Sequence, residues 1–138
     1  MIFFEEFKVK TPERESLMDI TSEISKIVRN SKIQEGVCRV FIPHTTAGVT
    51  INENADPSVK IDISNFFEKL IPQGGRLGYS FRHREGNSDA HIKCTLTGHS
   101  VEIIIHNERL MLGTWQGVMF AEYDGPRKRR VFVQIQGQ

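Results

Sequence analysis

The sequence predicts an α+β fold in one domain, with an antiparallel-rich sheet or sandwich and two main helices. Three observations carry this prediction. Two segments space their apolar residues as amphipathic helices do, seven or eight short runs have strand composition, and a length of 138 residues suits one domain. The 38% hydrophobic and 25% charged content is that of an ordinary globular chain.

Two segments have helical apolar spacing. The first follows Asp19, a plausible N-cap, and its apolar residues are Ile20, Ile24, Ile27 and Val28. The second begins at Asp56 and Pro57, an N-cap followed by proline at the first helical position, and it ends at Pro72. Its apolar residues are Val59, Ile63, Phe66, Phe67 and Leu70.

Runs of β-branched and aromatic residues predict the strands. They are 2–10, 37–42, 49–51, 92–96, 100–106, 110–112, 118–123 and 130–135. A hairpin-like connection at 97–99 joins two of them. The polar stretch 75–89 is expected to be a loop, and a loop this long is either functional or disordered.

Charge and composition exclude several classes of protein. A formal net charge of +1 gives no case for nucleic acid or an anionic membrane as a partner, and no segment approaches the roughly 20 apolar residues of a membrane span. The N-terminal MIFFEEFKVK carries acids where a signal peptide needs bases. Cys38 and Cys94 are interpreted as buried free thiols. Together these features predict a cytoplasmic protein.

Three of the five histidines have polar residues as close neighbours in the sequence. His83 and His91 bracket the stretch HREGNSDAH, and His44 precedes Thr45 and Thr46 in PHTTAG. Three neutral imidazoles suit a divalent transition metal, with zinc the commonest tetrahedral case. The alternative is a solvated turn held by Asx hydrogen bonds, and the spacing alone slightly favours it.

Two carboxylates are candidate bases. Asp89 lies two residues before His91 and could accept the ring N–H that a metal does not use. Glu53 lies in INENADP, between a strand and a capped helix, where it would serve as a base or a metal ligand. The alternative for the INENADP segment is local capping of the helix that follows.

Two further segments could contact a substrate. Trp115, flanked by Thr114 and Gln116 in LGTWQG, would suit a pocket wall with an aromatic platform, or would simply belong to the core. In DGPRKRR the four consecutive bases are expected mainly as a solvated face. The alternative is phosphate or carboxylate binding by Arg127, because arginine offers a planar bidentate fork.

Four blocks together resemble the YjbQ family, small proteins often labelled secondary thiamine-phosphate synthases. They are PHTTAGVTINENADP (43–57), HREGNSDAHIK (83–93), LGTWQG (112–117) and EYDGPR (122–127). The resemblance covers most of the chain, so 1–138 is expected to be one YjbQ-like domain. Departures are small: Phe81 stands where a tyrosine is common, and Glu108 replaces a usual glycine.

The resemblance implies a sandwich-like core, a homotrimer and a metal site where His44, His83 and His91 converge; His99 and His106 match no functional block. It also implies the joining of a pyrimidine pyrophosphate to a thiazole phosphate. Arg127 and the metal would neutralise the pyrophosphate, Trp115 would face the pyrimidine, and further substrate contacts would come from Thr45, Thr46, Asn87, Thr114 and Gln116. The metal is expected to be zinc, or magnesium if the pyrophosphate chemistry applies.

Three other functional hypotheses are also compatible with the sequence. One is a metal-dependent enzyme, a hydrolase for example, that acts on a small phosphorylated or anionic metabolite with Glu53 or Asp89 as base. Another is an oligomeric module that binds a metal or metabolite without turnover. In the third, the polar loop only stabilises the oligomer.

Overall fold

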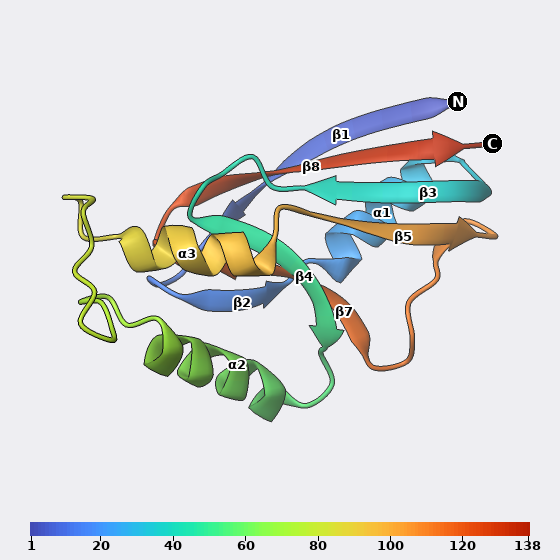
Figure 1. Ribbon diagram of the computed structural model, residues 1–138. Helices are drawn as coiled ribbons and strands as arrows, with labels where there is room; N and C mark the ends of the chain where they lie inside the picture. Colours follow the sequence, from blue (N-terminus) through green and yellow to red (C-terminus); the bar gives the residue numbers. More distant parts are fainter.

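Eight strands and three helices make up the chain in a computed structural model that describes residues 1–138 (Figure 1). In chain order they are β1 (Ile2–Lys10), β2 (Ser16–Asp19), α1 (Thr21–Ser31), β3 (Glu35–Phe41), β4 (Ala47–Glu53), α2 (Pro57–Leu70), α3 (Ser88–Thr97), β5 (Ser100–His106), β6 (Arg109–Leu110), β7 (Gln116–Glu122) and β8 (Lys128–Gly137). The predicted α+β class is confirmed. None of the helices is both long and apolar enough to cross a membrane.

The strands form two antiparallel sheets. One has the order β1-β8-β3-β5-β6 and the other the order β2-β7-β4. Their inner faces and α1 enclose the main hydrophobic core, which contains Ile24 of α1, Val40 of β3, Phe120 of β7 and Val133 of β8. The opposite face of β7 packs against α3 through Ala121, so β7 is buried on both sides.

The segment 92–96, predicted as a strand, is part of α3 instead. The helix buries Ala90, Lys93 and Cys94, which lie three and four positions apart on the face toward β7. A lysine at the centre of the buried face hides the helical apolar period, so the remaining residues resemble an alternating strand. The expected 97–99 hairpin is therefore a helix-to-strand turn, in which Gly98 has a φ of +96°.

The predicted N-cap of α2 is confirmed, whereas that of α1 is wrong by one residue, because Ile20 occupies the N-cap position. Asp56 caps α2 as predicted, because its carboxylate accepts the backbone N–H of Ser58 at 2.9 Å. Asp19 lies one residue before the N-cap position of α1, yet it accepts the backbone N–H of Thr21 at 2.9 Å.

Among the strands, the prediction missed only the four-residue strand β2. Both cysteines are buried and unpaired, as predicted.

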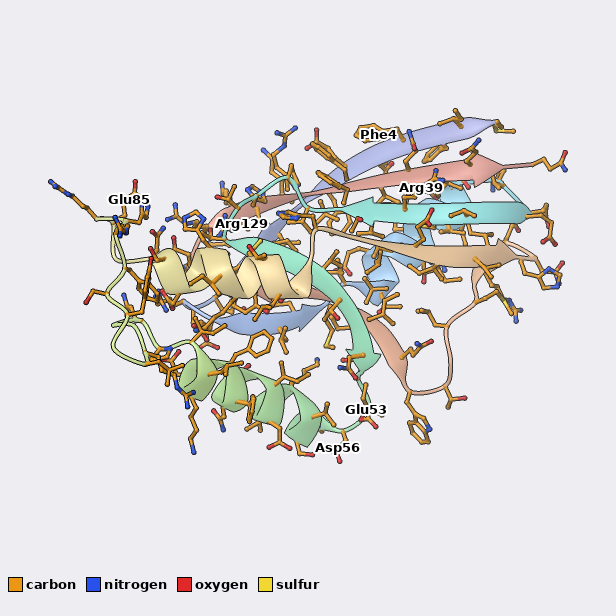
Figure 2. The ribbon with its side chains drawn as sticks, in the orientation of Figure 1. Phe4, Arg39, Glu53, Asp56, Glu85 and Arg129 are labelled. Carbon is orange, nitrogen blue, oxygen red and sulfur yellow. The ribbon has the colours of Figure 1, made fainter.

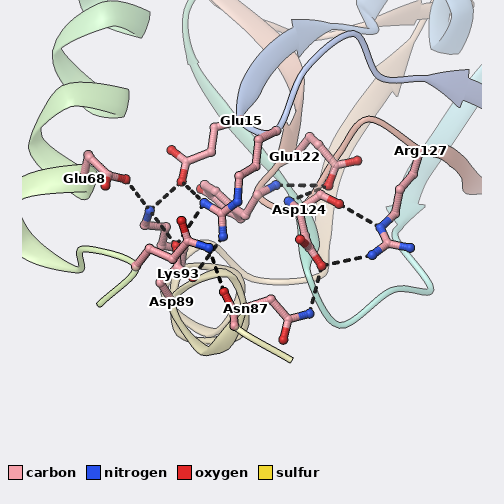
Figure 3. A network of polar contacts seen from close by, with 12 residues as sticks. Glu15, Glu68, Asn87, Asp89, Lys93, Glu122, Asp124 and Arg127 are labelled. Carbon is pink, nitrogen blue, oxygen red and sulfur yellow. Dashed lines mark hydrogen bonds and ion pairs between the residues drawn. The ribbon is translucent and has the colours of Figure 1, made fainter. Parts of the chain in front are cut away.

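Lys93 lies inside a cluster of carboxylates (Figure 3). Its ammonium contacts Glu15 at 2.6 Å, Glu68 at 3.1 Å and Asp89 at 3.4 Å. Burial lowers the pKa of Lys93, but the hydrogen bonds to Glu15 and Glu68 outweigh it and leave this pKa above its ordinary value. The cluster ties α3 to α2 and, through Arg14 and Glu15, to the segment before β2.

We expect Lys93→Met to destabilise the protein by about 3 kcal/mol or more, because it leaves the fully buried Asp89 with one cationic partner fewer. Urea unfolding followed by circular dichroism would measure this. Lys26→Met, on the exposed side of α1, is the matched control and should change stability by less than about 0.5 kcal/mol. Equal effects of the two substitutions would show that the buried cluster contributes nothing specific.

Candidate functional site

A cavity of about 350 Å³ lies where three segments meet: the turn between β3 and β4, the start of α3, and the connection from β7 to β8. Apart from Pro43, each lining residue carries a polar or charged side chain. The others are His44, Thr45, Thr46, Glu85, Asn87, His91, Asp124, Arg127 and Arg129. Figure 2 shows Glu85 and Arg129 on this side of the molecule.

The alternation of β8 buries one residue of the basic run. Lys128 and Arg130 are exposed, whereas Arg129 lies on the same side as Val131 and Val133 and is 5% exposed. The expectation that the whole run is a solvated face is therefore wrong for Arg129. The two-residue period shared with Val131 and Val133 was the signal that could have identified it.

Arg129 forms a buried ion pair with Glu122 at the end of β7. Its Nε donates to Glu122 at 2.7 Å and its Nη2 donates both to Glu122 and, at 2.8 Å, to the Thr46 hydroxyl. Glu122 also accepts the Thr11 hydroxyl and the backbone N–H of the two residues that follow it. The pair therefore holds the His44–Thr46 turn against β7 and β8. The Nη1 of Arg129 makes no hydrogen bond within the chain, although Arg129 lines the cavity.

Asp124, in the connection from β7 to β8, organises another part of the lining (Figure 3). Its carboxylate accepts Nη2 of Arg127 at 3.1 Å and Nδ2 of Asn87 at 2.9 Å, and its carbonyl oxygen accepts Nε of Arg127 at 2.7 Å. These bonds orient Arg127 and Asn87, and they leave Nη1 of Arg127 without a partner in the chain. Sequence reasoning had singled out Arg127 and Asn87 but neither Asp124 nor Glu122, although both acids belong to the EYDGPR block.

His44 is held as a neutral imidazole. Its Nε2 accepts the backbone N–H of Arg130 at 2.9 Å, so the neutral ring carries its proton on Nδ1. Burial lowers the pKa of His44, and the guanidinium groups of Arg129 and Arg130 lower it further, while Glu122 partly offsets them. The neutral ring therefore offers an N–H donor at Nδ1.

The other two histidines are neighbours. His91 lines the cavity, its ring makes no hydrogen bond within the chain, and it lies edge-to-face with His83 at 5.5 Å between ring centroids. His83 borders an adjoining groove of about 370 Å³ that also contains His91, Tyr79 and Phe81. The structure thus brings His44 and His91 to one cavity and places His83 beside it.

The three histidines do not fit a single ion as they are placed. Only Glu15, Glu68 and Asp89 bring three possible metal-ligand atoms within 4.8 Å of one another. These three carboxylates surround the Lys93 ammonium. The Nε2 lone pair of His44 is also engaged by the Arg130 N–H. A metal at His44, His83 and His91 stays a prediction.

The two predicted bases lie outside the cavity lining. Asp89 is fully buried and binds Arg14 through both oxygens, at 3.1 and 3.2 Å, besides Lys93. Burial raises its pKa, but Arg14 and Lys93 outweigh this and hold that pKa below its usual range. Glu53 accepts the backbone N–H of Asp56 at 3.0 Å, and Figure 2 shows it far from Glu85. The geometry supports a structural role for both.

The LGTWQG segment also lies apart from the cavity of its own chain. Thr114, Trp115 and Gln116 are absent from the lining. Trp115 is 64% exposed, so it is not a core residue, and the side chain of Gln116 accepts the backbone N–H of Gly113 at 2.8 Å. The expected aromatic platform is therefore not part of this site within one chain.

We expect His44 to titrate below its ordinary pKa of about 6.5, because burial disfavours the charged ring and protonation would place a cation beside Arg129 and break the bond from Arg130. Histidine Cε1–H shifts in a pH series, assigned with His44→Gln, would measure this. Since folding favours the neutral ring, its contribution to stability is complete above the unfolded pKa and declines as the pH falls toward the folded value. A midpoint at or above 6.5 would contradict the arrangement.

Comparison with known proteins assigns the chain to a family. The profile described as UPF0047 protein YjbQ-like matches residues 5–138. A UPF0047 protein of Methanocaldococcus jannaschii is 53% identical over 131 residues, which cover 95% of this chain and 92% of that protein. YugU of Bacillus subtilis is 44% identical over 130 residues, 94% of this chain and 96% of that protein.

Solved structures agree with the sequence comparison. An uncharacterised YjbQ/UPF0047 protein of Clostridium acetobutylicum superimposes with a TM-score of 0.91 at 50% identity, over 96% of this chain and 99% of that chain. A YbjQ-like protein of unknown function from Sulfolobus solfataricus gives 0.92 at 30% identity, over 100% and 99% of the two chains. The resemblance carried by the four sequence blocks is confirmed, and the chain belongs to the YjbQ (UPF0047) family.

Proposed function

We propose that the cavity binds a small phosphorylated or carboxylated metabolite and presents it to a histidine for acid–base chemistry. One observation carries the proposal. The Nη1 groups of Arg127 and Arg129 have no partner in the chain, and both residues line a cavity whose other side chains are almost all polar. Arginine N–H groups held in fixed directions are suited to carboxylate and phosphate oxygens.

The donors gather on one side of the cavity. The Nδ1–H of His44, the hydroxyl of Thr46 and the free guanidinium N–H groups all belong to the β3–β4 turn or to the β7–β8 region. Asp124 and the buried Glu122 compensate much of the arginine charge. Besides burial, which lowers the pKa of His44 most, the charges of Arg129, Arg130 and Arg127 lower it further despite Glu122. An anion is therefore expected to bind against this wall.

We expect inorganic phosphate to bind the wild-type protein in isothermal titration calorimetry at low ionic strength, and Arg127→Gln to weaken that binding about ten-fold. The matched control is Arg39→Gln, because Arg39 is also exposed and paired with a carboxylate, that of Glu102 at 2.8 Å. Both variants should melt near the wild-type temperature. Unchanged affinity in Arg127→Gln, or an equal loss in the control, would reject the anion site.

His91 is the best-placed group for proton transfer. It lies on α3 and borders the cavity, and its ring nitrogens make no hydrogen bond within the chain. A ligand anchored by Arg127 would therefore lie within the same small cavity as this imidazole. The reaction that the family label implies also needs an aromatic surface, which this cavity lacks. We therefore propose the more general function, an enzyme that acts on a small anionic metabolite.

If the site is catalytic, His91→Gln should lower turnover at least 100-fold while ligand affinity changes by less than three-fold. A panel of phosphate monoesters, followed by release of inorganic phosphate, and the thiamine-phosphate precursors, followed by product formation, would cover hydrolysis and transfer. His106→Gln is the control, because His106 is exposed and pairs with Glu35 outside the cavity. Binding without turnover of any panel member would favour the binding module.

Metal dependence is a separate part of the proposal. Zinc at His44, His83 and His91 would require the rings to rearrange, although the 5.5 Å between His83 and His91 makes this pair the natural starting point. Elemental analysis of untagged wild type beside His91→Ala tests it. About one metal per chain, lost in the variant, would support the site. No bound metal even after zinc addition would leave a metal-free acid–base site, for which neither zinc nor magnesium need be invoked.

Assembly and location also stay proposals. The outer face of the β1-β8-β3 sheet exposes Phe4 and Phe41 beside Phe132, which is the surface we would assign to the homotrimer. Sedimentation equilibrium of wild type and Phe4→Ser would test this. The cytoplasmic location rests on the sequence features and on two unpaired buried cysteines.

A further inference from the structure

Asn87 contains a buried acceptor that the chain does not satisfy. The residue lines the cavity, is 8% exposed, and its Oδ1 has no hydrogen-bond partner. Ser16 Oγ is the only other buried side-chain polar atom without a partner. Because an unpaired buried acceptor costs free energy, such an atom on a residue that lines a cavity indicates a partner that the chain itself does not supply.

The direction of the Asn87 amide is determined by its neighbour. Nδ2 donates to the Asp124 carboxylate at 2.9 Å, and a carboxylate accepts but cannot donate (Figure 3). Turning the amide over would place two oxygens against each other. Asp124 is itself held by Arg127 at 3.1 Å, so the orientation does not depend on one contact. Oδ1 is therefore the atom left without a partner.

The position of Asn87 in the helix makes this orientation unusual. Asn87 is the N-cap residue of α3, where an asparagine oxygen ordinarily accepts a backbone N–H of the first turn. Here the side chain makes no capping bond, and only its backbone carbonyl accepts from Ala90 and His91. The side chain has thus been directed away from the helix and toward Asp124, at the expense of a stabilising cap.

We infer that the ligand of this cavity carries a hydrogen-bond donor, an O–H or N–H group, beside its anionic group, and that Asn87 Oδ1 accepts from that donor. The inference rests on the proposed anion site and narrows its substrate class to hydroxylated or aminated anions. The anion meets the guanidinium groups of Arg127 and Arg129. Asn87, Glu85 and Asp124 contribute acceptors to the same lining, and Asp124 links Asn87 to Arg127.

Matched ligand pairs test this inference by calorimetry on the full chain. Glycerol 3-phosphate and propyl phosphate differ in their hydroxyl groups, as do lactate and propionate, while phosphoethanolamine and ethyl phosphate differ in an ammonium group. We expect wild type to prefer the donor-bearing member of at least one pair about ten-fold or more. Asn87→Ala should abolish the preference while it changes the affinity for the other member less than three-fold.

Asn87→Ser is a second variant that separates loss of the acceptor from loss of folding. Serine is a good N-cap, so this variant should keep the melting temperature of wild type or raise it, and still lose the preference. Asn65→Ala, on an exposed position of α2, should retain the preference. A purely structural Asn87 would show the reverse pattern, with a lower melting temperature and an intact preference in the Asn87 variants.

The outcomes separate the two proposals. Equal affinity for both members of every pair in wild type, or a preference that survives in Asn87→Ala and Asn87→Ser, would overturn the role of Asn87 and leave the anion site standing. Failure of all these anions to bind would overturn the anion site itself and the inference with it.

Discussion

The buried pair of Glu122 and Arg129 is the interaction on which the site depends. Removing two charges from water is costly, and the pair is tolerable because hydrogen bonds satisfy the atoms that the charges present. Glu122 accepts from a side chain, from backbone N–H groups and from the guanidinium, and Arg129 also binds Thr46. Loss of either partner would leave an uncompensated charge in the core, at a cost of roughly 3–5 kcal/mol.

This pair also determines where the neighbouring groups point. With the β3–β4 turn held against β8, the ring of His44 meets the backbone N–H of Arg130 and stays neutral. The same connection from β7 to β8 carries Asp124, which orients Arg127 and Asn87. The cavity is thus arranged by the buried bonds of Arg129 and by the more exposed bonds of Asp124, which orient its donors and acceptors before any ligand arrives.

A second polar cluster positions α3, the element that brings His91 to the cavity. Lys93 and Asp89 lie on the buried side of this helix and bind Glu15, Glu68 and Arg14. Asp89 resembled a catalytic carboxylate in the sequence, since it lies two residues from His91. In the structure its role is to anchor the helix, because both of its oxygens are already occupied by cations.

Local rules predicted most of the elements. The β1 strand, the Asp56–Pro57 start of α2 and the strand 100–106 follow from residue type and spacing, which act over a few neighbouring residues. They failed at α3, where a buried lysine interrupts the apolar face. In the site, the chemistry of Arg127 and three histidines and the family resemblance for Asn87 identified residues that line the cavity or the groove beside it.

Sequence alone therefore determined the α+β class, the family blocks and a set of polar residues suited to a ligand. Only the tertiary structure decided which of these residues share a cavity. Glu53 belongs to the same sequence block as His44, and Trp115 belongs to another of the four blocks, yet both residues lie outside the cavity lining. The physical reason is that strands from distant parts of the chain pair with one another, β4 with β7 and β8 with β1 and β3. This pairing determines which residues lie next to each other in space. Burial then decides which charges are paired and which remain free for a ligand.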